Sequence, residues 1–226
     1  MKKSAPFPTV SLEEHSRQWE AEGIPILRAQ AFLPHLSSPL RHCRSIQRFN
    51  RFYYEYLRAF RRFCAKDILP RAKEDFGAAA AQSRPLPLTK ATLRSVVAYE
   101  KNGLVSLYTD LTVTAPQSRF HTRSADTWDL GSGYPVALSD LYPAGYPIKK
   151  ELVRFARQMA AERIKAGEVF CENYRRALRR HFSSRRFYLT PQGLVFFYPR
   201  GLVAPAEQGT VTFLVPYGEN GPVLPA

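Results

Sequence analysis

The sequence of 226 residues is 45% hydrophobic and 13% aromatic, which can bury a sizeable core and excludes a chain that is mostly disordered. No stretch approaches the roughly 18 consecutive apolar residues of a membrane-spanning helix, which argues against an integral membrane protein. The 33 Lys and Arg residues outnumber the 19 Asp and Glu residues and give a formal net charge of +14. This excess favours polyanions such as nucleic acid, anionic lipid or wall polymer, and it equally suits a surface that is basic only for solubility.

The first 23 residues are polar and mixed, and they predict a loose arm with one helical turn at residues 12–19. Lys2 and Lys3 are not followed by the apolar stretch of about 7 to 15 residues that a signal peptide contains. No export signal is readable, so a cytoplasmic location is the default expectation. Residues 24–27, with Ala31 and Phe32, then predict a short strand that enters a loop at Pro34. Pro25 places this strand at a sheet edge because proline has no N–H to donate.

The clearest periodicity lies between Cys43 and Phe76, where apolar residues recur at steps of three and four and predict one long amphipathic helix. Basic residues gather on the opposite side of this helix. The candidate anion-binding residues among them are Arg44, Arg48, Arg51, Arg58 and Arg62, and Lys66 continues the row. Such a row suits a phosphate backbone, although a solvated polar face is its commoner role.

Residues 77–87 are low in complexity and end in two prolines, so they predict a loop or linker. Alternating strands at 92–99 and 104–113 follow, joined through Asn102-Gly103, which is the strongest short hairpin signal. A third strand is expected at 119–128.

Residues 148–182 predict one or two helices, broken near Gly167. A hairpin at 186–198 and a last strand at 211–215 close the chain. A second basic cluster accompanies the second helix, and its candidate anion-binding residues are Arg175, Arg176, Arg179, Arg180, Arg185 and Arg186. A helix C-terminus also favours arginine through its dipole alone.

Together these elements predict an α+β fold in which an antiparallel sheet packs against one long amphipathic helix and a C-terminal helix pair. The expected organisation is a loose arm at 1–23, a strand and long-helix subdomain at 24–84, a sheet-and-helix domain at 85–217 and a tail at 218–226.

Cysteines and histidines do not indicate a metal, disulfide or cofactor site. Cys43, Cys64 and Cys171 are odd in number and widely spaced, and we interpret them as small hydrophobic residues. The five histidines are scattered, and no GxSxG, P-loop, GxGxxG or HExxH motif is present. We therefore expect no cofactor and no metal.

One compact set of residues could do acid–base work: Asp126, Asp129 and Asp140 near His121. Asp129 precedes a Gly-Ser-Gly turn, and Asp140 suits the start of a short helix, so structural roles are the simpler interpretation. The expectation is a protein without catalytic residues.

Two segments carry a recognisable pattern, and three shorter ones follow it. They are Asp126–Leu130 with Gly133 and Leu138–Leu141; Phe187–Tyr198; and Ala204-Pro205, Gly209 and Phe213–Tyr217. In this order they resemble the domain of unknown function 3298 at the C-terminus of the anti-sigma factor RsiV and of the peptidoglycan deacetylase PdaC. The resemblance is firmest over residues 90–217, and the long helix before them resembles the usual companion domain more weakly. Its motif residues, expected to be structural, are Asp126, Trp128, Asp129, Asp140, Tyr188 and Gly193.

The resemblance implies a bacterial binding or sensing module whose relatives lie outside the cytoplasm. In RsiV the paired domains bind lysozyme, and in PdaC they accompany a separate catalytic domain. A protein or cell-wall ligand is therefore the primary expectation, although the +14 charge disfavours lysozyme, which is itself basic. The alternative, indicated by charge alone, is a nucleic-acid-binding or polyanion-binding protein.

Overall fold

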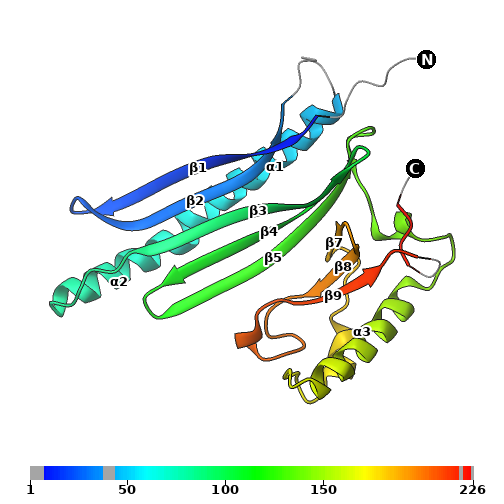
Figure 1. Cartoon of the computed structure of the whole chain (residues 1–226). Coiled ribbons are helices and arrows are strands. Elements are labelled where there is room, and N and C mark those ends of the chain that lie inside the picture. Colours follow the sequence, from blue (N-terminus) through cyan, green and yellow to red (C-terminus); the bar gives the residue numbers. More distant parts are fainter. Residues whose placement is uncertain (1–7, 38–43, 219–220, 225–226) are drawn as a thin grey trace. The chain divides into compact units, whose positions relative to one another are not determined.

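The structure, a computed structural model, describes residues 8–37, 44–218 and 221–224 (Figure 1). Among these residues no helix is both long and apolar enough to cross a membrane. The elements in chain order are β1 (Val10–Ala21), β2 (Ile24–Leu36), α1 (Arg44–Phe63), η1 (Cys64–Ile68), α2 (Leu69–Ala81), β3 (Thr89–Lys101), β4 (Leu104–Ala115), β5 (Ser118–Asp129), β6 (Tyr134–Pro135), η2 (Leu138–Leu141), α3 (Ile148–Lys165), α4 (Tyr174–Arg180), β7 (Phe187–Thr190), β8 (Gly193–Tyr198), η3 (Ala206–Gln208) and β9 (Val211–Pro216).

The predicted α+β class is confirmed. Six strands form one sheet in the order β1-β2-β3-β4-β5-β6, and the last three strands form a second sheet in the order β7-β8-β9. Neighbouring strands β1 and β2, β7 and β8, and β8 and β9 are antiparallel, whereas β2 and β3 pair in parallel. The parallel pair exists because the long helix between β2 and β3 returns the chain to the end of the sheet from which β2 started.

The chain forms two compact units, and strands β3, β4 and β5 contribute a part to each. The domain boundary expected at residue 85 falls in the loop between α2 and β3. Unit 1 comprises the residues up to Val96, Thr109–His121 and Leu130–Tyr134; unit 2 comprises Val97–Tyr108, Thr122–Asp129 and the residues from Pro135 onward.

In unit 1 the expected loose arm is wrong for residues 10–21, which form strand β1. Its backbone pairs with β2 from Val10 opposite Leu36 to Ala21 opposite Ile24. The turn residues Glu22 and Gly23 have φ values of 54° and 75°, as a tight hairpin requires. The expected helical turn at 12–19 is absent because β2 satisfies this backbone as a strand. Residues 1–7 of the expected arm lie outside the described residues.

Because β1 occupies the edge, β2 is an interior strand and not the edge strand that Pro25 suggested. Pro25 pairs with Glu20, directly after a register shift between Trp19 and Glu20. A bulge of this kind accommodates a residue that cannot donate to the ladder.

The long amphipathic helix is confirmed as α1, η1 and α2, running without a break from Arg44 to Ala81. Its buried side includes Phe49 and Leu57, and α1 lies against β2 (Figure 1). The middle turn is π-helical, with the Leu69 N–H bonded to the Cys64 carbonyl, one residue before Pro70. This wider turn accommodates a proline, which has no N–H for the α pattern.

The loop expected from residue 77 begins only after Ala81. Residues 77–81 are the last turn of α2, because alanine is the strongest helix former. The Asn102-Gly103 hairpin is confirmed, with φ values of 53° and 76°.

Unit 2 is built around an aromatic core on the three-stranded sheet. The rings of Phe196 and Phe213 stack with centroids 5.4 Å apart, and the buried Tyr198 hydroxyl donates to the Leu178 carbonyl at 2.9 Å. Helices α3 and α4 pack on each other, and the break between them contains Gly167 at φ 95°. The predicted helix pair and C-terminal strands are confirmed.

Candidate functional site

The family-motif residues of unit 2 mostly hold the fold. Asp140 Oδ2 accepts the Ala137 N–H at 2.8 Å and so caps η2. Tyr188 is buried, with its ring 4.9 Å from that of Tyr108. A Cβ on Gly193 would collide with the Val215 carbonyl oxygen, so only glycine fits at this first position of β8, beside β9.

The acid–base set considered from sequence is divided between the units. His121 belongs to unit 1, where its Nε2 lies 3.5 Å from Asp110 Oδ1. Asp126 and Asp129 belong to unit 2 and are half-buried, and Trp128 between them is buried. Across the described ranges, no three His, Cys, Asp or Glu side chains are grouped to hold a metal ion. Cys64 and Cys171 are free thiols, and Cys43 lies outside the described residues.

The predicted basic row on α1 is exposed, but two of its members are already engaged within unit 1. Arg48 donates to the Ser132 carbonyl at 3.1 Å and lies 4.2 Å above the Tyr134 ring. Arg58 pairs with Glu55 at 3.1 Å. The remaining members, all exposed, are Arg44, Arg51, Arg62 and Lys66.

The second basic cluster spreads over several surroundings. Arg175 donates to the Tyr174 hydroxyl, which raises the pKa of this guanidinium, and Arg186 donates to the His181 carbonyl. Arg176 and Arg180 are exposed on α4. Arg179 and Arg185 differ from these because each lines a hollow of unit 2.

The first of these, which we call the α3 hollow, has a volume of about 720 Å³ and lies at the start of α3. Its cationic side chains are Lys149, Lys150, Arg157 and Arg179, set around apolar residues, and none of the described residues that line it is acidic. Arg157 is fixed in place, because its Nε and Nη2 donate to the Arg175 carbonyl at 3.1 and 2.9 Å. The positive end of the helix dipole adds to this charge.

An adjoining hollow of about 850 Å³ shares Ile148 and Lys149 with the α3 hollow, so the two hollows lie side by side. Its wall carries the fifth cation, Arg185, with the hydroxyl groups of Ser139 and Ser184. Asp126 also lines it and is the one acidic side chain among its described lining residues. The combination can bind an anionic group at Lys149 or Arg185 and hydroxyl groups beside it.

Sequence reasoning found two of these five cations and missed Lys149, Lys150 and Arg157. A signal was present, because residues 149, 153 and 157 are four apart and lie on one side of a helix. The hollow itself depends on α4 packing against α3, and no local pattern encodes that contact.

The sequence profile described as "Protein of unknown function (DUF3298)" matches residues 140–218. Residues 140–218 are a DUF3298 domain. The resemblance to the domain of unknown function 3298 is thereby confirmed over these residues, and the weaker resemblance of the long helix to a companion domain stays a prediction. All five cations of the two hollows lie inside the DUF3298 domain, whereas the basic row of α1 lies outside it.

Solved structures extend the likeness to nearly the whole chain. A DUF3298 family member from Bacteroides fragilis has a TM-score of 0.60 at 14% identity, covering 93% of this chain and 92% of that chain. A DUF3298 family protein from Pseudomonas aeruginosa has a TM-score of 0.55 at 17% identity, covering 98% of this chain and 96% of that chain. Identities this low show a shared fold alone. No match was found among the curated proteins.

Proposed function

We propose that this protein is a non-catalytic binding module that holds an anionic polymer in the α3 hollow and the adjoining hollow. The observation that carries the proposal is the convergence of Lys149, Lys150, Arg157 and Arg179 on one hollow of about 720 Å³. Cations held this close together repel one another, and an anionic ligand offsets that repulsion.

The chemistry of the two adjoining hollows favours a polymer over a single small anion. Its cations extend from Arg179 in one hollow to Arg185 in the other, with Lys149 common to both. Ser139 and Ser184 beside Arg185 can bond to hydroxyl groups of a ligand. We infer a polyol-phosphate chain, in which phosphates alternate with hydroxylated units as in anionic wall polymers.

The first test is a fluorescence-anisotropy titration of the whole chain with labelled poly(glycerol phosphate), short DNA and short RNA. Three or four neutralised phosphates predict that affinity falls roughly 50-fold between 50 and 200 mM salt. The absence of binding to any of the three at 50 mM salt would overturn the proposal. DNA or RNA binding tenfold tighter than poly(glycerol phosphate) would replace the wall polymer with the nucleic-acid alternative.

A matched pair of variants locates the site. Arg179→Glu should lower the affinity for poly(glycerol phosphate) at least tenfold at 50 mM salt. Arg71→Glu, the same charge change on the exposed side of α2, should lower it less than threefold. Equal losses in the two variants would mean that the overall charge, and not the α3 hollow, binds the polymer.

A further inference from the structure

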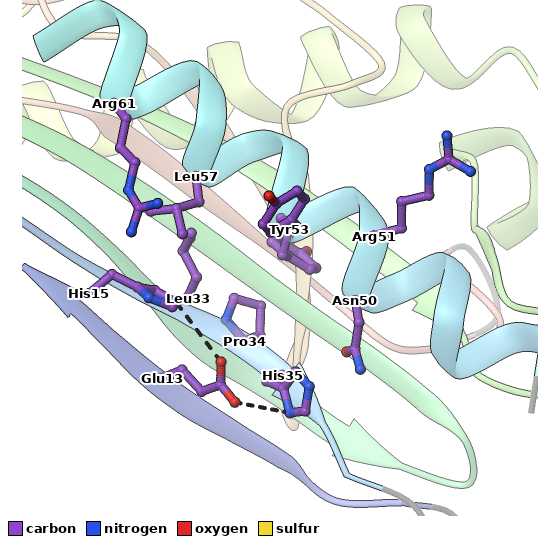
Figure 2. A pocket seen from close by; sticks show the side chains of 11 residues that line it. Glu13, His15, Leu33, Pro34, His35, Asn50, Arg51, Tyr53, Leu57 and Arg61 are labelled. Atoms are coloured by element: carbon purple, nitrogen blue, oxygen red, sulfur yellow. Dashed lines mark ion pairs between the residues drawn. The ribbon is translucent and has the colours of Figure 1, made fainter. Parts of the chain in front are cut away.

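Unit 1 contains a hollow of its own, with a volume of about 500 Å³, between strands β1 and β2 and helix α1 (Figure 2). It shares no lining residue with the hollows of unit 2. We call it the β1–α1 hollow. Its volume falls in the range of small-molecule sites.

The floor of the β1–α1 hollow is apolar and rigid. Leu33, Tyr53 and Leu57 line it and are at most 4% exposed. Asn50 fixes α1 to β2 beside them, because its side-chain amide both donates to the Leu36 carbonyl and accepts the Leu36 N–H, each at 2.9 Å. The floor of the hollow is therefore already formed before a ligand binds.

Three elements bring titratable and charged groups to the rim. Glu13 and His15 lie on the same side of β1, two residues apart, and His35 comes from β2. The Glu13 carboxylate lies 3.2 Å from His35 Nδ1 and 3.9 Å from His15 Nε2. From α1, Arg61 extends toward the strands beside His15, whereas Arg51 points away from the Glu13–His35 pair (Figure 2).

We propose that the β1–α1 hollow binds a small organic anion with an apolar body, and that it binds this ligand more tightly when His15 and His35 are protonated. The apolar floor accepts the body, and Arg61 beside His15 accepts the acidic group. Protonated His15 and His35 offset the charge of the Glu13 carboxylate between them, which otherwise repels an anion. Histidine is the side chain that changes charge between about pH 5 and 8.

The charges around the hollow determine the direction of this pH dependence. Arg51 and Arg61 against Glu13 leave one positive charge on the lining when both imidazoles are neutral, and protonation of both adds two more. The lining also contains the hydroxyl groups of Tyr53 and Tyr54. An anion should therefore bind about tenfold more tightly at pH 5.5 than at pH 8.

The test uses benzenesulfonate, whose charge is constant over this range, and follows the imidazole signals of His15 and His35 by NMR. Both signals should shift and saturate, with a Kd about tenfold lower at pH 5.5 than at pH 8. Benzyl alcohol supplies the ring without the charge, and inorganic sulfate supplies the charge without the ring; each should bind at least tenfold more weakly. The proposal fails if benzenesulfonate moves neither signal at pH 5.5, or if sulfate alone binds equally well.

Neighbouring arginines supply the matched control. Arg61→Gln should weaken benzenesulfonate binding about fivefold to tenfold, whereas Arg62→Gln, next to it on α1 but outside the hollow, should change it less than twofold. His15→Asn combined with His35→Asn should remove the pH dependence. If that variant is misfolded by circular dichroism, the arginine pair decides alone, and equal effects at Arg61 and Arg62 reject the site.

Discussion

The α1 row and the α3 hollow contain the same kinds of side chain in different surroundings. On α1, Arg48 donates a hydrogen bond to the Ser132 carbonyl and lies over the Tyr134 ring. Arg58 forms an ion pair with Glu55. Around the start of α3, Lys149 and Arg179 converge on one hollow with two further cations. A helix that carries arginines along its length spreads them over its exposed surface, whereas the start of one helix packed beside another brings them together.

The comparison shows why net charge alone does not identify a binding site. Both regions contribute to the charge of +14. Only in unit 2 do cations from α3 and α4 share a hollow whose described lining has no acidic group. The cations of both regions are largely exposed, so the difference lies in their arrangement. Cations that converge on one hollow attract an anion more strongly than cations spread along a helix.

The largest expected effect compares two triple neutralisations. Replacing Lys149, Lys150 and Arg179 with Gln should lower the affinity for poly(glycerol phosphate) roughly 30-fold at 50 mM salt, because three phosphate contacts are lost. Replacing Arg51, Arg62 and Lys66 with Gln should lower it less than threefold. Anisotropy titration measures both affinities. A larger loss in the α1 variant would mean that the α1 row, and not the α3 hollow, binds the polymer.

Arg48 should affect stability and not binding. Arg48→Gln removes a charged hydrogen bond to Ser132 and a contact with the Tyr134 ring, and should cost about 1–2 kcal/mol of unfolding free energy. Arg44→Gln, an exposed neighbour on α1, should cost less than about 0.5 kcal/mol. Urea unfolding measures both, and equal values would show that Arg48 is no more structural than the rest of the row.

An alkaline pH series tests the buried groups of each unit. Burial raises the pKa of the Cys64 thiol in unit 1 and of the Tyr142 hydroxyl in unit 2 to about 12, from ordinary values of 9.0 and 10.0. The folded state keeps these protons to higher pH than the unfolded state does, so the associated stability is complete below about pH 9 and is lost as pH rises toward 12. The Tm should therefore fall across this window.

Tyr142→Phe should reduce that fall. The Tyr142 hydroxyl is buried and has no hydrogen-bond partner in the part of the chain that the structure describes, so its removal should not lower the Tm at pH 7. Between pH 7 and pH 11 the variant should lose about 2–4 °C less than the native protein in thermal unfolding. An unchanged pH dependence would mean that Tyr142 does not contribute to it.

The smallest expected effect is at Arg58. Its pair with Glu55 is exposed on both sides, so Arg58→Gln should change the unfolding free energy by less than about 0.5 kcal/mol. The affinity of the Arg58→Gln variant for poly(glycerol phosphate) should also change less than twofold. A loss above 1 kcal/mol by urea unfolding would show that the α1 row is structurally important beyond Arg48.

Elements with a strong local signal were predictable from the sequence. The Asn102-Gly103 hairpin depends on residues that tolerate positive φ, and the long helix on apolar residues repeated between Cys43 and Phe76. Strand β1 was missed because most of its side chains are exposed, so they show no apolar alternation. The strand forms because its backbone pairs with β2. The Glu22-Gly23 turn also lacks the usual first residue of such a hairpin.

The candidate sites were predictable only in part. Arg179 and Arg185 stand in a visible basic cluster, whereas Arg157 precedes it by almost 20 residues and reaches the hollow because α3 packs on α4. The β1–α1 hollow was not predictable, since His35 comes within 3.2 Å of Glu13 only through the pairing of β1 with β2. Arg61 reaches these strands only because α1 packs on β2.

The most direct test of the central claim is to map backbone amide shifts in ¹⁵N NMR while adding poly(glycerol phosphate) at 50 mM salt. The largest shifts should fall at residues 148–157 and 179–185, with residues 44–66 nearly unchanged. Largest shifts along 44–66, or shifts spread evenly over all exposed basic residues, would contradict the claim that the convergent hollow of the DUF3298 domain is the binding site.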